Sequence, residues 1–432
     1  MILKNTTCLI LHPARVEYAD LRVQDGVIVS RGRNLSPRKG EETVDLSGRY
    51  VMPGLVNTHM HLYSVLARGM KGPARPPRTF LDVLKSIWWR LDTALDDESV
   101  YYSALVGSIE AAKCGTTLIV DHHASPGHIR GSLDLIKKAM TAVGLRGILC
   151  YETTDRGGTG KRDQGLEENE RFITENANNP HFRGTMGAHA SFTLNDDSLG
   201  TLGDLSGMYD CGVHLHVAED RADVADAARR RADIIGRLQK KGILSGKSIL
   251  AHGVHLTGRQ VAVINRTGSW LVHNPRSNMN NAVGYAPVDR FGPHSALGTD
   301  GFPSDMFEES SAGFFRNRES AHRVAITRWP EMLHGGQLLA SKFWGSDFGT
   351  LRAGSPADLI VLDYPPPTPL VSGNVAGHFL FGMKSGMVKH VMVDGRWILF
   401  NGRMTEVDEE KIMAEASAAA GALWRRWERN GK

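Results

Sequence analysis

The sequence predicts an α/β protein: a (β/α)8 TIM-type barrel with a small β-sandwich domain built from both chain ends. Two observations predict the barrel. Short apolar runs recur along the middle of the chain, and several of these runs end in a histidine or a carboxylate. A third observation concerns the chain ends, where apolar and polar residues alternate and Asp-Gly turns interrupt the runs. We therefore expect a barrel that is inserted between the two halves of one β domain.

The length and the composition agree with this division. The chain has 432 residues, of which 41% are hydrophobic and 23% charged, so it is long enough for one barrel and a smaller module. We expect the small β domain at residues 1–52 and 356–405, the barrel at residues 53–355 and a C-terminal helix at residues 406–432. Apolar residues at four-residue steps indicate that this helix packs against the body of the protein; they are Ile412, Ala416, Ala420 and Trp424, with Trp427 on the same side.

Eight apolar runs are the predicted barrel strands. The first ends near His59, and the others lie at residues 116–121, 146–152, 183–189, 212–219, 248–256, 270–275 and 295–301. After the first step, successive strand ends lie roughly 20 to 40 residues apart, which is the length of a βα unit. The first step is longer and contains the Gly/Pro-rich residues 69–80 and the pair Trp88-Trp89. Such an insertion at the catalytic end of a barrel is typical of a lid or of a subunit interface, and the sequence leaves both open.

Two histidines end the first predicted strand. His59 and His61 are two positions apart, and residues i and i+2 of an extended strand point to the same side. Both imidazole rings can therefore hold one metal ion. A lone histidine beside an apolar run is more often a structural residue, so the pair is the stronger signal.

Further side chains of this kind follow later strands. His216 and Glu219 end the fifth strand, His252 ends the sixth, and Asp300 ends the eighth. Asp300 precedes a glycine, and an Asp-Gly pair alone would indicate a turn. His214 shares the face of His216, so it is either an alternative ligand or packed one layer below. Because the carboxyl ends of the strands meet at one rim of a barrel, the set indicates a metal-dependent hydrolase.

These motifs together resemble the amidohydrolase superfamily, specifically its aminohydrolase or deaminase branch. The resemblance rests on His59-x-His61 after Met-Pro-Gly, on His216-x-x-Glu219, on Ala-His252, on the segment His-Asn-Pro-Arg-Ser-Asn278 and on Gly-Thr-Asp300. Three further motifs are similar to aminohydrolases associated with selenium metabolism, the SsnA-like group: Trp88-Trp89, Tyr101-Tyr102-Ser103 and Val-Asp-His-His-Ala-Ser at residues 120–125.

The resemblance implies one divalent metal ion. It assigns this ion to four side chains, which are His59, His61, His216 and Asp300. Zinc suits the imidazole ligands, and iron is the alternative. Members with two ions bridge them by a modified lysine after the fourth strand, and residues 184–190 contain no lysine.

The resemblance also implies hydrolytic deamination of a small nitrogen heterocycle of the purine, pyrimidine or pteridine type, with release of ammonia. A divalent cation lowers the pKa of bound water from about 15.7 to near 7. Asp300 would then accept a proton, Glu219 would protonate the ring nitrogen, and His252 would stabilise the tetrahedral intermediate. The alternatives are hydrolysis of a cyclic amide, dechlorination of a triazine-like ring, and a non-catalytic scaffold. A scaffold predicts damaged ligands, whereas the expected set is complete.

Five residues near strand ends are predicted to bind the substrate or to support the residues that do: His189, His122, Asn274, Asn278 and Glu152. The resemblance assigns His189 to substrate contact. His122 and His123 depart from the better-known relatives, which leaves the identity of the heterocycle open.

The remaining features concern partners and location. A net charge of +4 without a dense Lys/Arg block predicts no nucleic-acid partner, so we expect a small-molecule substrate. The N-terminal apolar run is too short for a signal or a membrane segment. The four cysteines lie far apart, which favours a reducing cytoplasmic location. The aromatic pair Trp88-Trp89 favours a homodimer or a higher homo-oligomer.

Overall fold

Parallel strands form the barrel of the computed structural model, which describes residues 1–430. The strands are β6 (Leu55–Met60), β7 (Thr116–His123), β8 (Arg146–Tyr151), β9 (Phe182–Gly184), β10 (Met186–Ala190), β11 (Val213–Val217), β12 (Ile249–His252), β13 (Trp270–His273) and β14 (Ser295–Leu297). They form two sheets, β6-β7-β8-β9 and β10-β11-β12-β13-β14, in which β9 and β10 are the two halves of the fourth strand. Parallel bridges between Met60 and Asp300 and between Thr153 and Ala188 close the ring. The predicted (β/α)8 barrel is confirmed.

The barrel strands are buried on both faces, which explains their nearly continuous apolar sequences. All residues of β7, for example, are buried, including Asp121, His122 and His123 at its carboxyl end. Polar side chains in such positions need hydrogen-bond or metal partners, because burying them unpaired is costly. The fold therefore concentrates polar side chains where their partners also converge, at the carboxyl ends of the strands.

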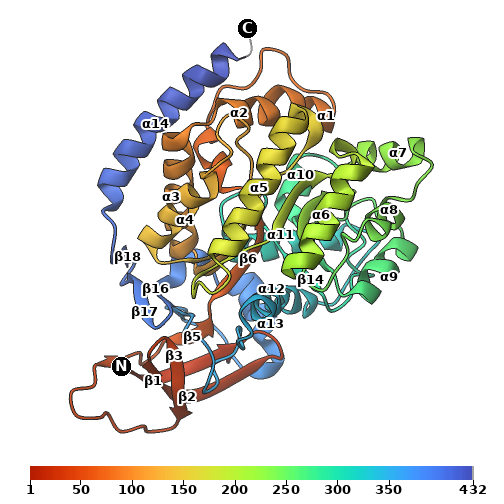
Figure 1. Ribbon diagram of the computed structural model, residues 1–432. Coiled ribbons are helices and arrows are strands. Elements are labelled where there is room, and N and C mark those ends of the chain that lie inside the picture. Colours follow the sequence, from red (N-terminus) through yellow and green to blue (C-terminus); the bar gives the residue numbers. More distant parts are fainter. Residues whose placement is uncertain (431–432) are drawn as a thin grey trace.

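Helices cover the outside of the barrel (Figure 1). They are α3 (Asp97–Lys113), α4 (Ser132–Val143), α5 (Thr159–Glu175), α6 (Asp196–Tyr209), α7 (Arg221–Arg229), α8 (Ile234–Lys240), α9 (Gly258–Thr267), α11 (Met306–Arg318) and α12 (Arg328–Trp344). The short helix α10 (Pro275–Asn280) follows β13 and is mostly buried. The shorter helices are η3 (Asp155–Gly157), η4 (Ser191–Thr193), η5 (Ser372–Asn374), α13 (Val375–Gly377), η6 (His378–Gly382) and η7 (Ser385–Met387). Local sequence marks the helix ends: Asp96 and Ser99 form a capping box at the start of α3, and Gly144 ends α4 with a φ of 89°.

The two chain ends form one sheet, toward the lower left in Figure 1. Its strands are β1 (Ile2–Ile10), β2 (Arg15–Gln24), β3 (Val27–Gly32), β4 (Thr43–Asp45), β5 (Tyr50–Pro53), β15 (Leu359–Leu362), β16 (Val388–Val393), β17 (Arg396–Phe400) and β18 (Arg403–Met404). The two halves meet where β5 pairs antiparallel with β15. At the predicted Asp-Gly turns, Asp25 and Asp394 have φ values of 49° and 50°, which type I′ hairpins require. The sheet is consistent with the predicted β-sandwich, and the domain boundaries stay a prediction.

The long connection between β6 and β7 is mainly helical. It contains the 3-10 helix η1 (Leu62–Ala67), α1 (Phe80–Val83), the π-helix η2 (Leu84–Trp88) and α2 (Trp89–Ala94). Residues 69–79 have neither helix nor strand and are mostly exposed. The segment predicted as a lid or an interface at residues 69–80 is thus a surface loop that leads into the helical residues 80–94.

The last helix, α14 (Glu409–Arg429), lies along α2 and α3 at the left edge of the molecule in Figure 1. Its buried residues are Ile412, Ala416, Ala419, Leu423 and Trp427, whereas Ala420 and Trp424 of the predicted stripe are only partly buried. An α-helix has 3.6 residues per turn, so residues spaced exactly four apart gradually rotate away from one face. The buried face therefore combines steps of three and four residues. Within residues 1–430, no helix is both long and apolar enough to cross a membrane.

Candidate active site

Four side chains converge at the carboxyl ends of the barrel strands. His59 and His61 come from the end of β6, His216 from β11, and Asp300 from the loop after β14. Their ligand atoms all lie within 4.8 Å of one another. Oδ1 of Asp300 is 3.2 Å from His59 Nε2 and 2.9 Å from His61 Nε2, and His61 Nε2 is 3.1 Å from His216 Nε2. The structure thus brings all four predicted metal ligands together.

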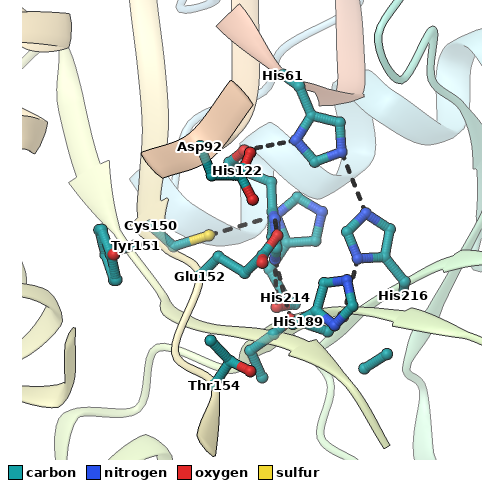
Figure 2. Close-up of polar contacts among 12 residues, drawn as sticks. His61, Asp92, His122, Cys150, Tyr151, Glu152, Thr154, His189, His214 and His216 are labelled. Carbon is teal, nitrogen blue, oxygen red and sulfur yellow. Dashed lines mark hydrogen bonds and ion pairs between the residues drawn. The ribbon is translucent and has the colours of Figure 1, made fainter. Parts of the chain in front are cut away.

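The hydrogen bonds of these histidines show that the cluster fits a divalent cation. His61 Nδ1 donates to the carbonyl oxygen of His122 at 2.6 Å, and His216 Nδ1 donates to that of His189 at 2.8 Å. Because a carbonyl oxygen only accepts, both Nε2 atoms present lone pairs to each other, as Figure 2 shows for the facing rings. These lone pairs repel unless a cation lies between them. A shared proton could relieve the repulsion between only two of these atoms, whereas one divalent ion can bind the ligand atoms of all four residues.

The backbone at the strand ends adopts uncommon conformations that aim these side chains. His252 has a φ of 74°, Asp300 a φ of 54° and Ala218 a φ of 48°, all in the left-handed region that non-glycine residues seldom occupy. Such residues cluster at functional sites, where the surrounding structure offsets their strain. Asp300 is held further by Ser277, whose Oγ donates to Oδ2 of the carboxylate.

His214 supports His59 from below the cluster. His59 faces Asp300 through Nε2, so its Nδ1 carries the proton and donates to His214 Nε2 at 2.8 Å. On the other side of the ring, His214 Nδ1 lies 3.7 Å from the buried thiol of Cys150 (Figure 2). His214 is not part of the four-residue cluster. Of the two readings that the sequence left open, the structure therefore favours packing one layer below the ligands.

We expect the substitution His214→Phe to weaken metal binding by about 10- to 100-fold, the usual effect of losing a partner that orients a ligand. The measurement is competition for the metal with a chelator of known affinity. His273→Phe is the matched control, because His273 is another fully buried barrel histidine, and neither of its ring nitrogens has a partner within residues 1–430. Equal metal affinity in both variants would show that His214 only fills space.

Glu219 and His252 lie beside the metal cluster. His252 Nε2 is 3.7 Å from Glu219 Oε2, and the ligand atoms of these two residues lie within 4.8 Å of that of Asp300. Burial raises the pKa of Glu219 to about 7. Asn278 orients the histidine, because His252 Nδ1 donates to Asn278 Oδ1 at 2.8 Å. A carboxyl group that holds a proton near neutral pH therefore faces the cluster.

The cluster opens into a cavity of about 240 Å³. Among the residues predicted to bind substrate, His189 and Glu152 line this cavity. The other three do not line it: Asn278 orients His252, Asn274 is fully buried beside Gly298, and His122 Nε2 contacts the carbonyl oxygens of Ala188 and His214. Their roles in substrate binding, or in supporting the residues that bind it, stay predictions. His122 nevertheless lies next to the cavity lining, because its Nδ1 is 3.6 Å from Oε2 of Glu152.

Asp92 is a further cavity residue, and no sequence motif predicted it. This aspartate of α2 lines the cavity, is only 2% exposed, and its Oδ1 has no hydrogen-bond partner within residues 1–430. Burial, with the neighbouring charge of Glu152, raises its pKa to about 8. Glu152 in turn accepts from Arg156 Nη2 at 2.7 Å, and the same Nη2 is 3.9 Å from Asp92 Oδ2. No motif marks Asp92, although its place in the long insertion after the first strand was a usable signal.

The barrel, its metal cluster and the adjoining acid define a metal-dependent hydrolase. The chain belongs to the amidohydrolase family, which matches residues 50–398. The predicted relationship to this superfamily is thereby confirmed, and so is the prediction that a divalent metal is required. The narrower resemblance to the SsnA-like group stays a prediction.

Known proteins similar to this chain include several deaminases. A 5'-deoxyadenosine deaminase from Methanothermobacter thermautotrophicus is 28% identical over 97% of this chain and 99% of its own length. A 5-methylthioadenosine/S-adenosylhomocysteine deaminase from Pyrococcus furiosus is 27% identical over 96% of this chain and 98% of its own. Among solved structures, an adenosine deaminase from Xanthomonas campestris with bound zinc has a TM-score of 0.85 and 22% identity over 98% of both chains. At that identity the structural likeness shows the fold alone.

Proposed function

We propose that this protein deaminates an adenine nucleoside hydrolytically and releases ammonia. The single observation that carries the proposal is the position of the buried Glu219, whose carboxyl group lies beside His252 and Asp300 at the metal cluster without being one of the four ligands. The deaminases that resemble the chain over nearly its whole length support the same reaction. The proposal keeps the predicted reaction and narrows the heterocycle to a purine.

We propose zinc as the ion held by His59, His61, His216 and Asp300, since three imidazole ligands suit it, with iron as the alternative. When bound, the ion supplies a Lewis acid that brings the pKa of water near neutral pH. Asp300 accepts a proton from the attacking water. Glu219 delivers a proton to the ring nitrogen. His252 Nε2, which is buried and without a partner in residues 1–430, donates to the developing oxygen charge when the imidazole ring carries both of its protons, the other being donated by Nδ1 to Asn278.

Asp92 and Glu152 favour a nucleoside over a free base. Both carboxyl groups line the cavity without belonging to the four-residue metal cluster, and Asp92 Oδ1 lacks a partner among the described residues. A buried carboxyl oxygen in this position awaits a donor from the ligand. The hydroxyl groups of a ribose supply such donors. Free adenine, in contrast, has donors only at its ring N–H and at the exocyclic amino group that the reaction removes. The aromatic residues Trp88 and Trp89 line the same cavity and suit a flat heterocycle.

The experiment that tests the function is ammonia release from a panel of compounds by the zinc-loaded protein. The panel contains adenosine, 5'-deoxyadenosine, 5'-methylthioadenosine, adenine and guanine, together with a cyclic amide and a chlorotriazine. Turnover of an adenine nucleoside above all others supports the proposal. Ring opening or chloride release without ammonia would replace it by the cyclic-amide or triazine reaction. The homo-oligomeric state and the cytoplasmic location stay predictions.

The substitution Asp92→Leu is expected to raise KM for an adenine nucleoside about tenfold or more, because the hydrogen bond between the ribose and a buried carboxyl group is lost while the branched shape of the side chain is kept. Turnover of free adenine, where it is measurable, should change little. Steady-state kinetics of both compounds measure the difference. Asp97→Leu is the control, since Asp97 starts α3 on the surface with its side chain 67% exposed. If the substitution impairs the reaction equally with the nucleoside and with free adenine, Asp92 does not bind the ribose.

A further inference from the structure

The segment that covers the cavity is held from outside by the C-terminal helix. We call residues 80–94, which comprise α1, η2 and α2, the active-site roof. Five of its side chains line the cavity: Phe80, Leu84, Trp88, Trp89 and Asp92. The position of the roof therefore sets the shape of the cavity on that side. In Figure 1 the upper end of α14 reaches the helices of this segment.

Arg90 of the roof binds the end of α14. Its Nε donates to the carbonyl oxygen of Trp427 at 2.7 Å, and its Nη2 donates to that of Glu428 at 3.2 Å. The guanidinium carbon also lies 3.6 Å from the centroid of the Trp427 ring. The last carbonyl groups of a helix have no partner within the helix, and a cation there also interacts favourably with the helix dipole. One side chain thus caps α14 and stacks on it.

The end of α14 makes contacts back to the roof. Trp427 is 3% exposed, and its Nε1 donates to the carbonyl oxygen of Ile87 at 3.4 Å. Ile87 lies in the π-helix η2, a rare geometry that is frequent at functional sites. Arg426 Nε donates to the carbonyl oxygen of Ala94 at 2.7 Å. Two points of the roof, one in each of its last two helices, are therefore tied to the same helix end.

We infer that Arg90 and Trp427 are positioning residues that hold the active-site roof in its substrate-binding place. Neither residue lines the cavity, so they act through the roof side chains and not by touching the substrate. The effect on substrate KM rests on the proposed function, whereas the effect on the amide hydrogen exchange of residues 80–94 does not. The C-terminal helix, for which the sequence indicated packing alone, thereby contributes to substrate binding.

The test uses Arg90→Gln and Trp427→Phe in the full-length, metal-loaded protein. The first removes the charge and the stacking, and the second keeps an aromatic ring but loses the indole N–H. We expect faster amide hydrogen exchange in residues 80–94, a KM raised about tenfold, and an unchanged metal content, because a loosened roof misplaces the side chains that bind substrate. Glu409→Gln is the control, since Glu409 at the other end of α14 pairs with Lys113 of α3 and not with the roof.

Native exchange rates in residues 80–94 in both variants would overturn the inference. A general rise in exchange across the barrel, or a loss of metal, would also overturn it, because the contacts would then only stabilise the fold. The two proposals fail separately. If no adenine nucleoside is deaminated, the proposed function fails, whereas the exchange rates of the roof still decide the role of Arg90 and Trp427.

Discussion

Replacing His216 by alanine is expected to remove the bound divalent ion and, with it, nearly all ammonia release. His216 supplies one of three imidazole nitrogens in a cluster that has one further ligand, the carboxylate of Asp300. A structural or catalytic metal site that loses one of its strong ligands is left with an incomplete shell, and metal affinity falls steeply. His61→Ala should behave in the same way. Elemental analysis of the purified variants gives the metal content per chain, and the ammonia assay gives the turnover.

His255→Ala is the appropriate control for this experiment. His255 lies just beyond β12, close in sequence to His252, yet it belongs to none of the metal-binding groups. We expect about one ion per chain in the native protein and in this control. Two tightly bound ions in the native protein would contradict the single-metal prediction and would revive the cyclic-amide reaction. Native metal content in His216→Ala would remove His216 from the ligand set.

The metal ligands could be predicted because each depends on local geometry. Side chains at positions i and i+2 of a strand share a face, so His59 and His61 needed only the strand prediction to be placed together. The barrel then brings distant strand ends to one rim, which adds His216 and Asp300. Within β11 the same rule placed His214 on the correct face but could not decide its depth. Depth depends on how neighbouring strands are staggered, and this stagger is a property of the closed barrel.

The substrate-facing residues could not be predicted in the same way. His122 ends a strand and Asn278 lies in the helix that follows one, yet each binds a protein group: His122 Nε2 contacts the carbonyl oxygen of Ala188, and Asn278 binds His252. Asp92 reaches the cavity only because α2 lies over the barrel, and that placement depends on contacts with α14 more than 300 residues later, such as the bond from Arg90 to Trp427. Tertiary packing, and not the local pattern, selects these residues. Arg90 and Trp427 are 337 positions apart in the sequence, and local periodicity cannot predict a contact between such distant residues.

Replacing Glu219 by glutamine is expected to leave metal binding near native and to lower turnover by roughly 10²-fold or more, the usual weight of general acid–base catalysis. Glutamine keeps the shape and the hydrogen bonds of the side chain but has no transferable proton. Glu219 is not among the four clustered ligands, although it lies beside Asp300 and His252. Metal analysis and ammonia release on the same preparation separate the two effects.

Asp300→Asn provides the contrast that makes the Glu219 experiment decisive. Asp300 contacts both His59 and His61 through Oδ1, so its loss should damage metal affinity and water activation together. Glu219→Gln should therefore keep its metal and lose turnover, whereas Asp300→Asn should lose both. If Glu219→Gln loses its metal, or keeps full activity, Glu219 is not the proton carrier. His252 then becomes the leading candidate, because its Nε2 is a protonatable atom that lies 3.7 Å from the carboxylate of Glu219.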